Sequence, residues 1–115
     1  MSTTIYGIKN CDTMKKAFKW LESNNIEYSF HDYKKAGLEE LQANEWVNEL
    51  GWENVINKRG TTWRKLDDTI KDTMNNETAV QVMIENPSII KRPLLIHNDS
   101  KTLGFKEAEY QTIFG

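Results

Sequence analysis

The stretch that decides the fold is Ile5-Tyr6-Gly7-Ile8-Lys9-Asn10-Cys11-Asp12-Thr13-Met14-Lys15-Lys16, near the start of the 115-residue chain. A short apolar run meets a glycine there and is followed by the beginning of an amphipathic helix. Cys11 is the only cysteine, and it lies at the first turn of this helix. Unpaired backbone N–H groups and the positive end of the helix dipole favour thiolate over thiol at such a place. The position therefore predicts a reactive cysteine.

The residues around this stretch predict a strand, a helix and a second strand. Residues 3–8 are β-branched and aromatic, which indicates a buried strand. From Asp12 apolar side chains recur at helical spacing until Ser23-Asn24-Asn25, and residues 26–33 then alternate as a second strand does. Parallel strands joined by one helix take the right-handed crossover, so the Cys11 turn is expected at the C-terminal edge of the first strand, where sites of open α/β sheets usually lie.

The middle of the chain, from residue 34 to residue 86, predicts several helices and no strand. Apolar residues recur at roughly helical spacing between Leu38 and Leu50, and Gly51 follows as a stop. Residues 52–57 predict a short helix. A further helix around residues 79–84 is ended by Asn86-Pro87, because the residue before proline avoids helical geometry.

The C-terminal part predicts a hairpin and a last helix. Leu94-Leu95-Ile96 is strand-like, residues 98–101 are turn-like, residues 102–105 form a second strand, and a helix over about residues 106–114 closes the chain. The order indicates an α/β, thioredoxin-like fold with a four-stranded mixed sheet. We expect a single domain over residues 1–115, with its core in about 1–34 and 88–115 and a helical insert over about 35–87.

Composition excludes several classes of function. A formal net charge of -2 and a pI near 5.7 argue against direct nucleic-acid binding. The mean hydropathy of -0.68 and the lack of a long apolar run predict no membrane segment. The N-terminus lacks the pattern of a secretory signal, so a cytoplasmic location is expected. With one cysteine and two histidines, no metal-ligand spacing is present and no metal site is predicted.

The single cysteine also limits any redox mechanism. One thiol cannot form an intramolecular disulfide, so disulfide chemistry at Cys11 requires a thiol from another molecule.

Four segments together resemble the arsenate reductase-like family (ArsC/Spx), especially its YffB branch. They run over residues 6–17 around Cys11, residues 59–66 (Arg-Gly-Thr-Thr-Trp-Arg-Lys-Leu), residues 87–93 (Pro-Ser-Ile-Ile-Lys-Arg-Pro) and Gly104-Phe105. The resemblance implies a thioredoxin-like fold with a helical insert and a cysteine nucleophile at Cys11. It also implies glutathione or a similar thiol as co-substrate, with no bound cofactor.

The sequence departs from the family pattern at three positions. Arsenate reductases of this family carry a histidine where this chain has Gly7, and an additional arginine where it has Phe105, which argues against arsenate reduction. Regulators of the Spx type usually carry a Cys-x-x-Cys pair, and the second position here is Met14. What remains is the set of Cys11, Arg59 and Arg92 shared with the YffB branch.

Residues beside Cys11 admit both structural and functional interpretations. Free cysteine is often buried and inert, but the flanking lysines and the helix start favour a reactive Cys11. Asp12 and Thr13 are expected to cap the helix, with substrate binding the alternative for Thr13. The resemblance places Pro93 as a cis-proline facing the cysteine, which would aim Arg92 toward Cys11.

The two arginines are the candidate anion-binding groups. The planar fork of an arginine suits carboxylates and oxyanions, so Arg92 is interpreted as a clamp rather than as an exposed residue beside a turn. Arg59 belongs to a basic cluster around residues 58–65, and such clusters are usually only solvated. It is singled out because it matches the family's second arginine. His31, His97 and the four tryptophans are expected to be structural.

These residues predict a thiol-dependent reductase that acts on a disulfide or an oxidised anionic substrate. Glutathione or a reduced partner protein would resolve the adduct on Cys11. The alternative is an Spx-like regulator or redox sensor without turnover, which docks on a partner such as RNA polymerase.

Overall fold

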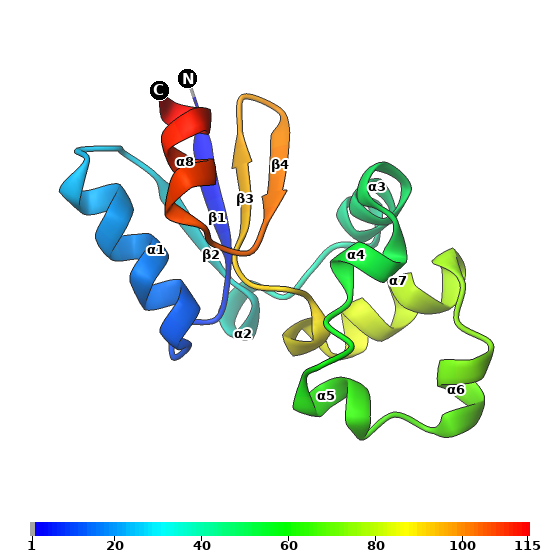
Figure 1. Cartoon of the computed structure of the whole chain (residues 1–115). Helices are drawn as coiled ribbons and strands as arrows, with labels where there is room; N and C mark the ends of the chain where they lie inside the picture. The colour runs from blue at the N-terminus through cyan, green and yellow to red at the C-terminus, as the bar shows by residue number, and fades with distance from the viewer. Residues whose placement is uncertain (1) are drawn as a thin grey trace. The chain divides into compact units, whose positions relative to one another are not determined.

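The computed structural model of the chain describes residues 2–115 (Figure 1). These residues form two compact units. The first combines the described residues up to Asp32 with Arg92–Gly115, and the second is Tyr33–Lys91. The sequence places the corresponding boundaries near residues 34 and 88. That both units act as one domain stays a prediction.

The first unit contains the four-stranded sheet, in the order β2-β1-β3-β4. Its strands are β1 (Thr3–Gly7), β2 (Ser29–Asp32), β3 (Leu94–His97) and β4 (Ser100–Leu103). β1 runs parallel to β2 and antiparallel to β3, which pairs antiparallel with β4. The sheet is therefore mixed, and the predicted α/β, thioredoxin-like fold is confirmed.

Two helices, α1 (Asp12–Ser23) and α8 (Glu107–Phe114), cover one face of this sheet (Figure 1). α1 buries one face of apolar side chains at the spacing expected from the sequence, and Tyr110 of α8 is fully buried with them. The cluster at the centre of the unit consists of Ile5, Met14, Ala17, Leu21, Leu95 and Tyr110. This packing holds the β1–α1 junction, which contains Cys11, against the core.

The second unit is helical. Its α-helices are α2 (Tyr33–Ala36), α3 (Glu40–Leu50), α4 (Trp52–Val55), α5 (Thr61–Arg64), α6 (Asp68–Asp72) and α7 (Asn76–Glu85), followed by the 3-10 helix η1 (Pro87–Ile89). α3 packs on α7, and Trp46 of α3 is fully buried. Gly51 ends α3 with φ +86°, a left-handed conformation that favours glycine, and α7 ends before Pro87, both as predicted.

Two strands differ in their bounds from the sequence prediction: β2 is shorter, and β4 is shifted toward the N-terminus. β2 begins at Ser29 rather than near residue 26, because the backbone N–H of Ile26 still bonds to the Leu21 carbonyl, 3.0 Å away, at the end of α1. The turn of the C-terminal hairpin needs only Asn98 and Asp99, which both have positive φ, so β4 begins at Ser100 rather than at residue 102.

One apolar side chain of α3 lies outside the core. Leu41 shares the spacing of the α3 core residues but is 72% exposed. The periodicity is only approximate there, and α3 buries Ala43, Trp46 and Val47 instead. Between residues 2 and 115, every helix is too short or too polar to cross a membrane.

Candidate functional site

Cys11 lies between β1 and α1 as the N-cap residue of the helix. Its backbone is extended, with φ -142° and ψ 129°, and its carbonyl accepts the first helical hydrogen bond from Lys15 N at 3.0 Å. The side chain is half-buried and packs against the sheet cluster, and it makes no capping hydrogen bond. The first-turn amides lack intrahelical partners, so they can donate hydrogen bonds to an anionic group bound at this end of the helix.

The expected capping role of Asp12 and Thr13 is wrong. α1 starts at Asp12 and its N-cap is Cys11, so both residues already belong to the first turn. Asp12 is exposed and its negative charge suits the helix dipole, but it opposes a thiolate on the neighbouring residue. Thr13 is half-buried, and a role for it in substrate binding stays a prediction.

Two of the departures from the family pattern, Gly7 and Met14, lie next to each other in the structure. Met14 is fully buried, and a Cβ built on Gly7 would overlap its Sδ and lie 2.7 Å from its Cε. The methionine that replaces a second cysteine thus fills the space that a side chain at residue 7 would need. Phe105, at the third departure, packs edge-on against Tyr110 with ring centroids 4.7 Å apart.

Arg92 and Pro93 lead into β3, in the same unit as Cys11. The peptide bond between them is cis, as the resemblance implied. Pro93 is buried and its carbonyl accepts a hydrogen bond from Gly104 N at 2.8 Å, whereas Arg92 is half-buried. A direct contact between the Arg92 guanidinium and the Cys11 thiol stays a prediction.

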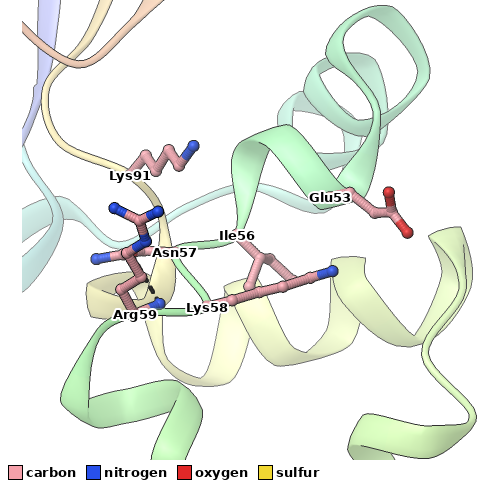
Figure 2. A pocket seen from close by; sticks show the side chains of 6 residues that line it. All are labelled: Glu53, Ile56, Asn57, Lys58, Arg59 and Lys91. Carbon is pink, nitrogen blue, oxygen red and sulfur yellow. Dashed lines mark hydrogen bonds between the residues drawn. The ribbon is translucent and has the colours of Figure 1, made fainter.

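Arg59 belongs to the second unit, where it lines a pocket of about 490 Å³ (Figure 2). The other lining residues are Glu53, Ile56, Asn57, Lys58 and Lys91. The structure therefore gives Arg59 a concave, cationic surrounding within its own unit. That Arg59 acts together with Cys11 stays a prediction.

Backbone pairing between two distant segments builds this pocket. Ile56 and Ile90 form an isolated antiparallel bridge, flanked by 2.8 Å hydrogen bonds from Asn57 N to Ile89 O and from Lys91 N to Val55 O. These bonds bring residues 55–59 alongside the end of the second unit. Lys91 thereby reaches a pocket whose other lining residues come from positions 53–59.

Local hydrogen bonds fix the loop that carries Arg59. The Asn57 side chain accepts a bond from Arg59 N at 3.1 Å, and the Arg59 carbonyl accepts one from Arg64 Nη2 at 3.0 Å. Arg64, also in the basic cluster, thus supports the loop. Lys58 Nζ lies 4.9 Å from the centroid of the Trp52 ring, a cation–π contact that orients the lysine.

Sequence reasoning did not assign Glu53 and Lys91 to a site. Lys91 directly precedes Arg92, but its place in the pocket lining depends on the bridge between Ile56 and Ile90, which neither hydropathy pattern nor spacing predicts. Elsewhere, His97 Nδ1 lies 2.7 Å from Thr3 Oγ1, in keeping with a structural role. Over residues 2–115, no three Cys, His, Asp or Glu residues gather as metal ligands.

Comparisons with known proteins agree with this architecture. The model of the ArsC family matches residues 6–113. An uncharacterised protein of Haemophilus influenzae is 47% identical over 111 residues, which cover 96% of this chain and 97% of that protein. A solved structure named YffB has 41% identity and a TM-score of 0.95, and the match covers 99% of this chain and 100% of the other.

A regulator is a more distant relative. The global transcriptional regulator Spx of Enterococcus faecalis is 28% identical over 108 residues, which cover 92% of this chain and 81% of Spx. The family match spans nearly the whole chain, and the Cys11 turn and the cis Arg92–Pro93 bond both lie within it. The chain therefore belongs to the ArsC family.

Proposed function

We propose that the chain is a thiol-dependent reductase with Cys11 as its nucleophile. The observation that carries the proposal is the half-buried thiol at the N-cap of α1, which makes no capping bond and so leaves the first-turn amides free to stabilise an anionic sulfur. Membership of the ArsC family supports the same chemistry.

The reaction is a pair of thiol–disulfide exchanges. The Cys11 thiolate attacks one sulfur of a disulfide, forms a mixed disulfide with it and expels the other sulfur as a thiolate, which takes up a proton. The thiolate of glutathione, or of a reduced partner protein, then attacks the mixed disulfide and releases Cys11. Because the chain has one cysteine, this second thiol is required in every cycle. Such a cycle suits the reducing cytoplasm.

Arg92 and Arg59 are the proposed anion-binding groups, and Thr13 is a proposed substrate contact. A guanidinium can hold a carboxylate or an oxyanion with two parallel hydrogen bonds, which a lysine cannot match. Arg92 is half-buried in the unit that carries Cys11, so it is the stronger candidate for the anionic part of the substrate. Pro93 and Asp12 are assigned structural roles at the site.

The test is turnover of a low-molecular-weight mixed disulfide with glutathione. We expect Cys11→Ser to abolish catalysis, and Arg92→Ala to lower kcat/KM by about tenfold or more because it removes a charge-assisted hydrogen bond. Arg92→Lys keeps the charge and should recover only part of the rate. Turnover in Cys11→Ser equal to that of the wild type would contradict the proposal.

A second measurement tests the thiol alone. The rate of Cys11 alkylation by iodoacetamide at pH 6.5 should be several-fold higher in the folded protein than in urea, because the helix start favours the thiolate only when α1 is formed. A slower rate in the folded state would show an inert, shielded thiol.

The similarity to Spx favours one other function, a regulator that binds a partner protein without turnover. Met14 leaves no internal disulfide switch, so Cys11 would serve as a simple sensor. Co-purification with RNA polymerase, retained in Cys11→Ser, together with absence of turnover, would support this alternative.

A further inference from the structure

We propose that a groove between α1 and α8 binds a short, extended segment of a partner protein, in which carboxylates precede two bulky apolar side chains. The groove lies in the first unit, and its lining residues belong neither to the Cys11 turn nor to the Arg59 pocket. The proposal goes beyond the reductase function and does not rest on it.

Two adjoining cavities form this α1–α8 groove, and they share Trp20 and Asn24. The first cavity, of about 400 Å³, lies between the solvent side of α1 and the residues that lead into α8, with Phe105 as its second aromatic wall. The second, of about 370 Å³, lies where α1 and α8 end, and Ile26 and Phe114 line it. Because the cavities meet at Trp20, one elongated ligand can occupy both.

The aromatic walls of the groove are fixed in place and still partly exposed. Trp20 and Phe105 are both half-buried. Their rings pack edge-on against the fully buried Tyr110, with centroids 5.6 Å and 4.7 Å from its ring. Asn24 Nδ2 donates a hydrogen bond of 2.8 Å to the Trp20 carbonyl, which fixes the point shared by the two cavities. An apolar side chain can therefore leave water in this groove without a large rearrangement of its walls.

The charge on the rim of the first cavity favours an acidic partner. Lys16 and Lys19 are neighbours on the surface of α1, and neither forms an ion pair with any of residues 2–115. Glu107, at the start of α8, contributes one carboxylate to the same lining. The whole chain has a formal net charge of -2, so the two lysines form a local cationic patch on an acidic protein. Carboxylates placed along α1 complement this patch, whereas a basic segment is repelled.

The length of the groove favours an extended segment over a small molecule. Lys16 and Asn24 are separated by about eight residues, so the α1 side of the groove is about 12 Å long, which about four extended residues span. In an extended chain, side chains at positions i and i+2 lie on one face, about 7 Å apart. One apolar side chain can thus enter each cavity. The second cavity is lined by apolar and amide side chains, so the carboxylates belong at the Lys16 end.

The probe is a synthetic peptide with this pattern, acetyl-Asp-Glu-Leu-Ser-Phe-Ser-amide, titrated into the ¹⁵N-labelled full chain. Each of the four tryptophans gives one indole N–H signal in the NMR spectrum, and Trp20→Phe identifies the signal of Trp20. We expect this signal to move saturably with the peptide. The other three tryptophans belong to the second unit, so their signals should stay in place.

Two control peptides separate charge from apolar contact. Replacement of Asp-Glu by Lys-Lys places cations beside Lys16 and Lys19, and replacement of both apolar residues by serine leaves the cavities empty. Each control peptide should bind at least about fivefold more weakly than the probe.

Charge variants of the lining residues assign the contacts. Lys16→Glu and Lys19→Glu should each weaken binding of the probe by about threefold to tenfold, and Glu107→Gln should strengthen it by about twofold. Lys65→Glu is the matched control, because Lys65 is an exposed lysine outside both cavity linings and the variant has the same net charge. It should leave the affinity unchanged.

A steric variant tests the groove without removing any of its packing. Ser23 is exposed at the end of α1 and lines the first cavity, so the larger side chain in Ser23→Tyr should block the groove and weaken binding by about tenfold or more. Circular dichroism of each variant checks that the helices are retained. Cys11→Ser should bind the probe as the wild type does, which separates this surface from the reductase chemistry.

Three results would overturn the proposal: a Trp20 signal that the probe does not move, equal binding of the Lys-Lys peptide, or equal losses in Lys16→Glu and Lys65→Glu. A Trp20 signal that moves with protein concentration in the absence of peptide would assign the groove to a second copy of this chain, and so would also contradict the acidic segment.

Discussion

The two units present their candidate residues on different kinds of backbone. In the first, Cys11 joins a five-residue strand to a twelve-residue helix, and both elements are predictable from periodicity. In the second, Arg59 lies in a loop between α4 and α5, each of four residues. Helices this short are not stable in isolation, so tertiary contacts must hold them. The second site therefore depends on residues that are distant in sequence.

Specific contacts supply that support. The rings of Trp52 in α4 and Trp63 in α5 stack with centroids 6.5 Å apart and planes 19° apart. Thr62 Oγ1 lies 2.9 Å from Ser88 Oγ of η1. Loss of tertiary packing in the second unit should therefore remove the Arg59 pocket, whereas α1 has a strong amphipathic pattern of its own.

The largest expected effect comes from Trp46→Ala. Trp46 of α3 is fully buried, and its truncation should lower the free energy of unfolding by about 3–5 kcal/mol. Urea titration followed by circular dichroism measures the loss. Leu41→Ala in the same helix, at a side chain that is 72% exposed, should change stability by less than about 0.5 kcal/mol.

The same variant tests whether the units are one domain. If they unfold together, alkylation of Cys11 and loss of helical signal in Trp46→Ala will follow a single transition. Loss of the helical signal at a lower urea concentration than the change in Cys11 reactivity would contradict the single-domain prediction. It would show that the second unit unfolds before the first.

An intermediate effect is expected from Gly7→Ala in the first unit. The added Cβ overlaps Met14, whose thioether must move within a closely packed core, so the variant should lose about 1–3 kcal/mol of stability. Met14→Ala alone leaves a cavity, but Gly7→Ala should cost much less in that background. A double-mutant cycle measures this coupling, and purely additive losses would show that the two residues do not compete for space.

A smaller effect than that of Gly7→Ala is expected at neutral pH from Tyr110→Phe. The hydroxyl of Tyr110 is buried and has no hydrogen-bond partner within residues 2–115, so its removal should change stability by less than about 1 kcal/mol. Burial, with a lesser contribution from Glu109, raises the pKa of Tyr110 far above the ordinary value of about 10.

The pH dependence follows from this shift. Below about pH 10, Tyr110 is protonated in both states and stability is unaffected. Above it, the unfolded chain loses the proton that the folded chain keeps, so stability falls by up to about 1.4 kcal/mol per pH unit. Tyr110→Phe should fall less steeply than the wild type in urea titrations between pH 9 and 11. Tyr28→Phe serves as a comparison. Burial and Glu22 also raise the pKa of Tyr28, but its side chain is only half-buried, so this variant should change the pH dependence less than Tyr110→Phe does. Parallel decline of wild type and Tyr110→Phe would refute the assignment.

Sequence patterns predict the first unit well because its elements are long enough to show a period. Met14, Ala17 and Leu21 define the buried face of α1, and the structure differs there mainly in the ends of β2 and β4. The ends of these strands cannot be predicted from periodicity, because they depend on single hydrogen bonds such as that from Ile26 N to Leu21 O. The reactive position of Cys11 follows from the same local pattern.

The second unit is less predictable, and so is its pocket. Helical pieces and the stops at Gly51 and Asn86-Pro87 are visible in the sequence, but the spacing between Leu38 and Leu50 does not reveal that Leu41 is exposed. Arg59 was singled out by resemblance, whereas Glu53 and Lys91 needed the bridge between Ile56 and Ile90, which joins residues 34 positions apart. The order of charged residues along the chain does not reveal which of them line the same pocket.

The contact between Gly7 and Met14 also restricts how this chain can diverge. A lineage that gains a side chain at residue 7 must first lose volume at residue 14, and the loss of Met14 leaves a void in the core. Each single step is expected to give a less stable protein, and the paired change is expected to cost less than the sum of the two losses. The two positions are therefore epistatic, and a chain that has acquired methionine at position 14 is held away from a histidine at position 7 by stability rather than by chemistry.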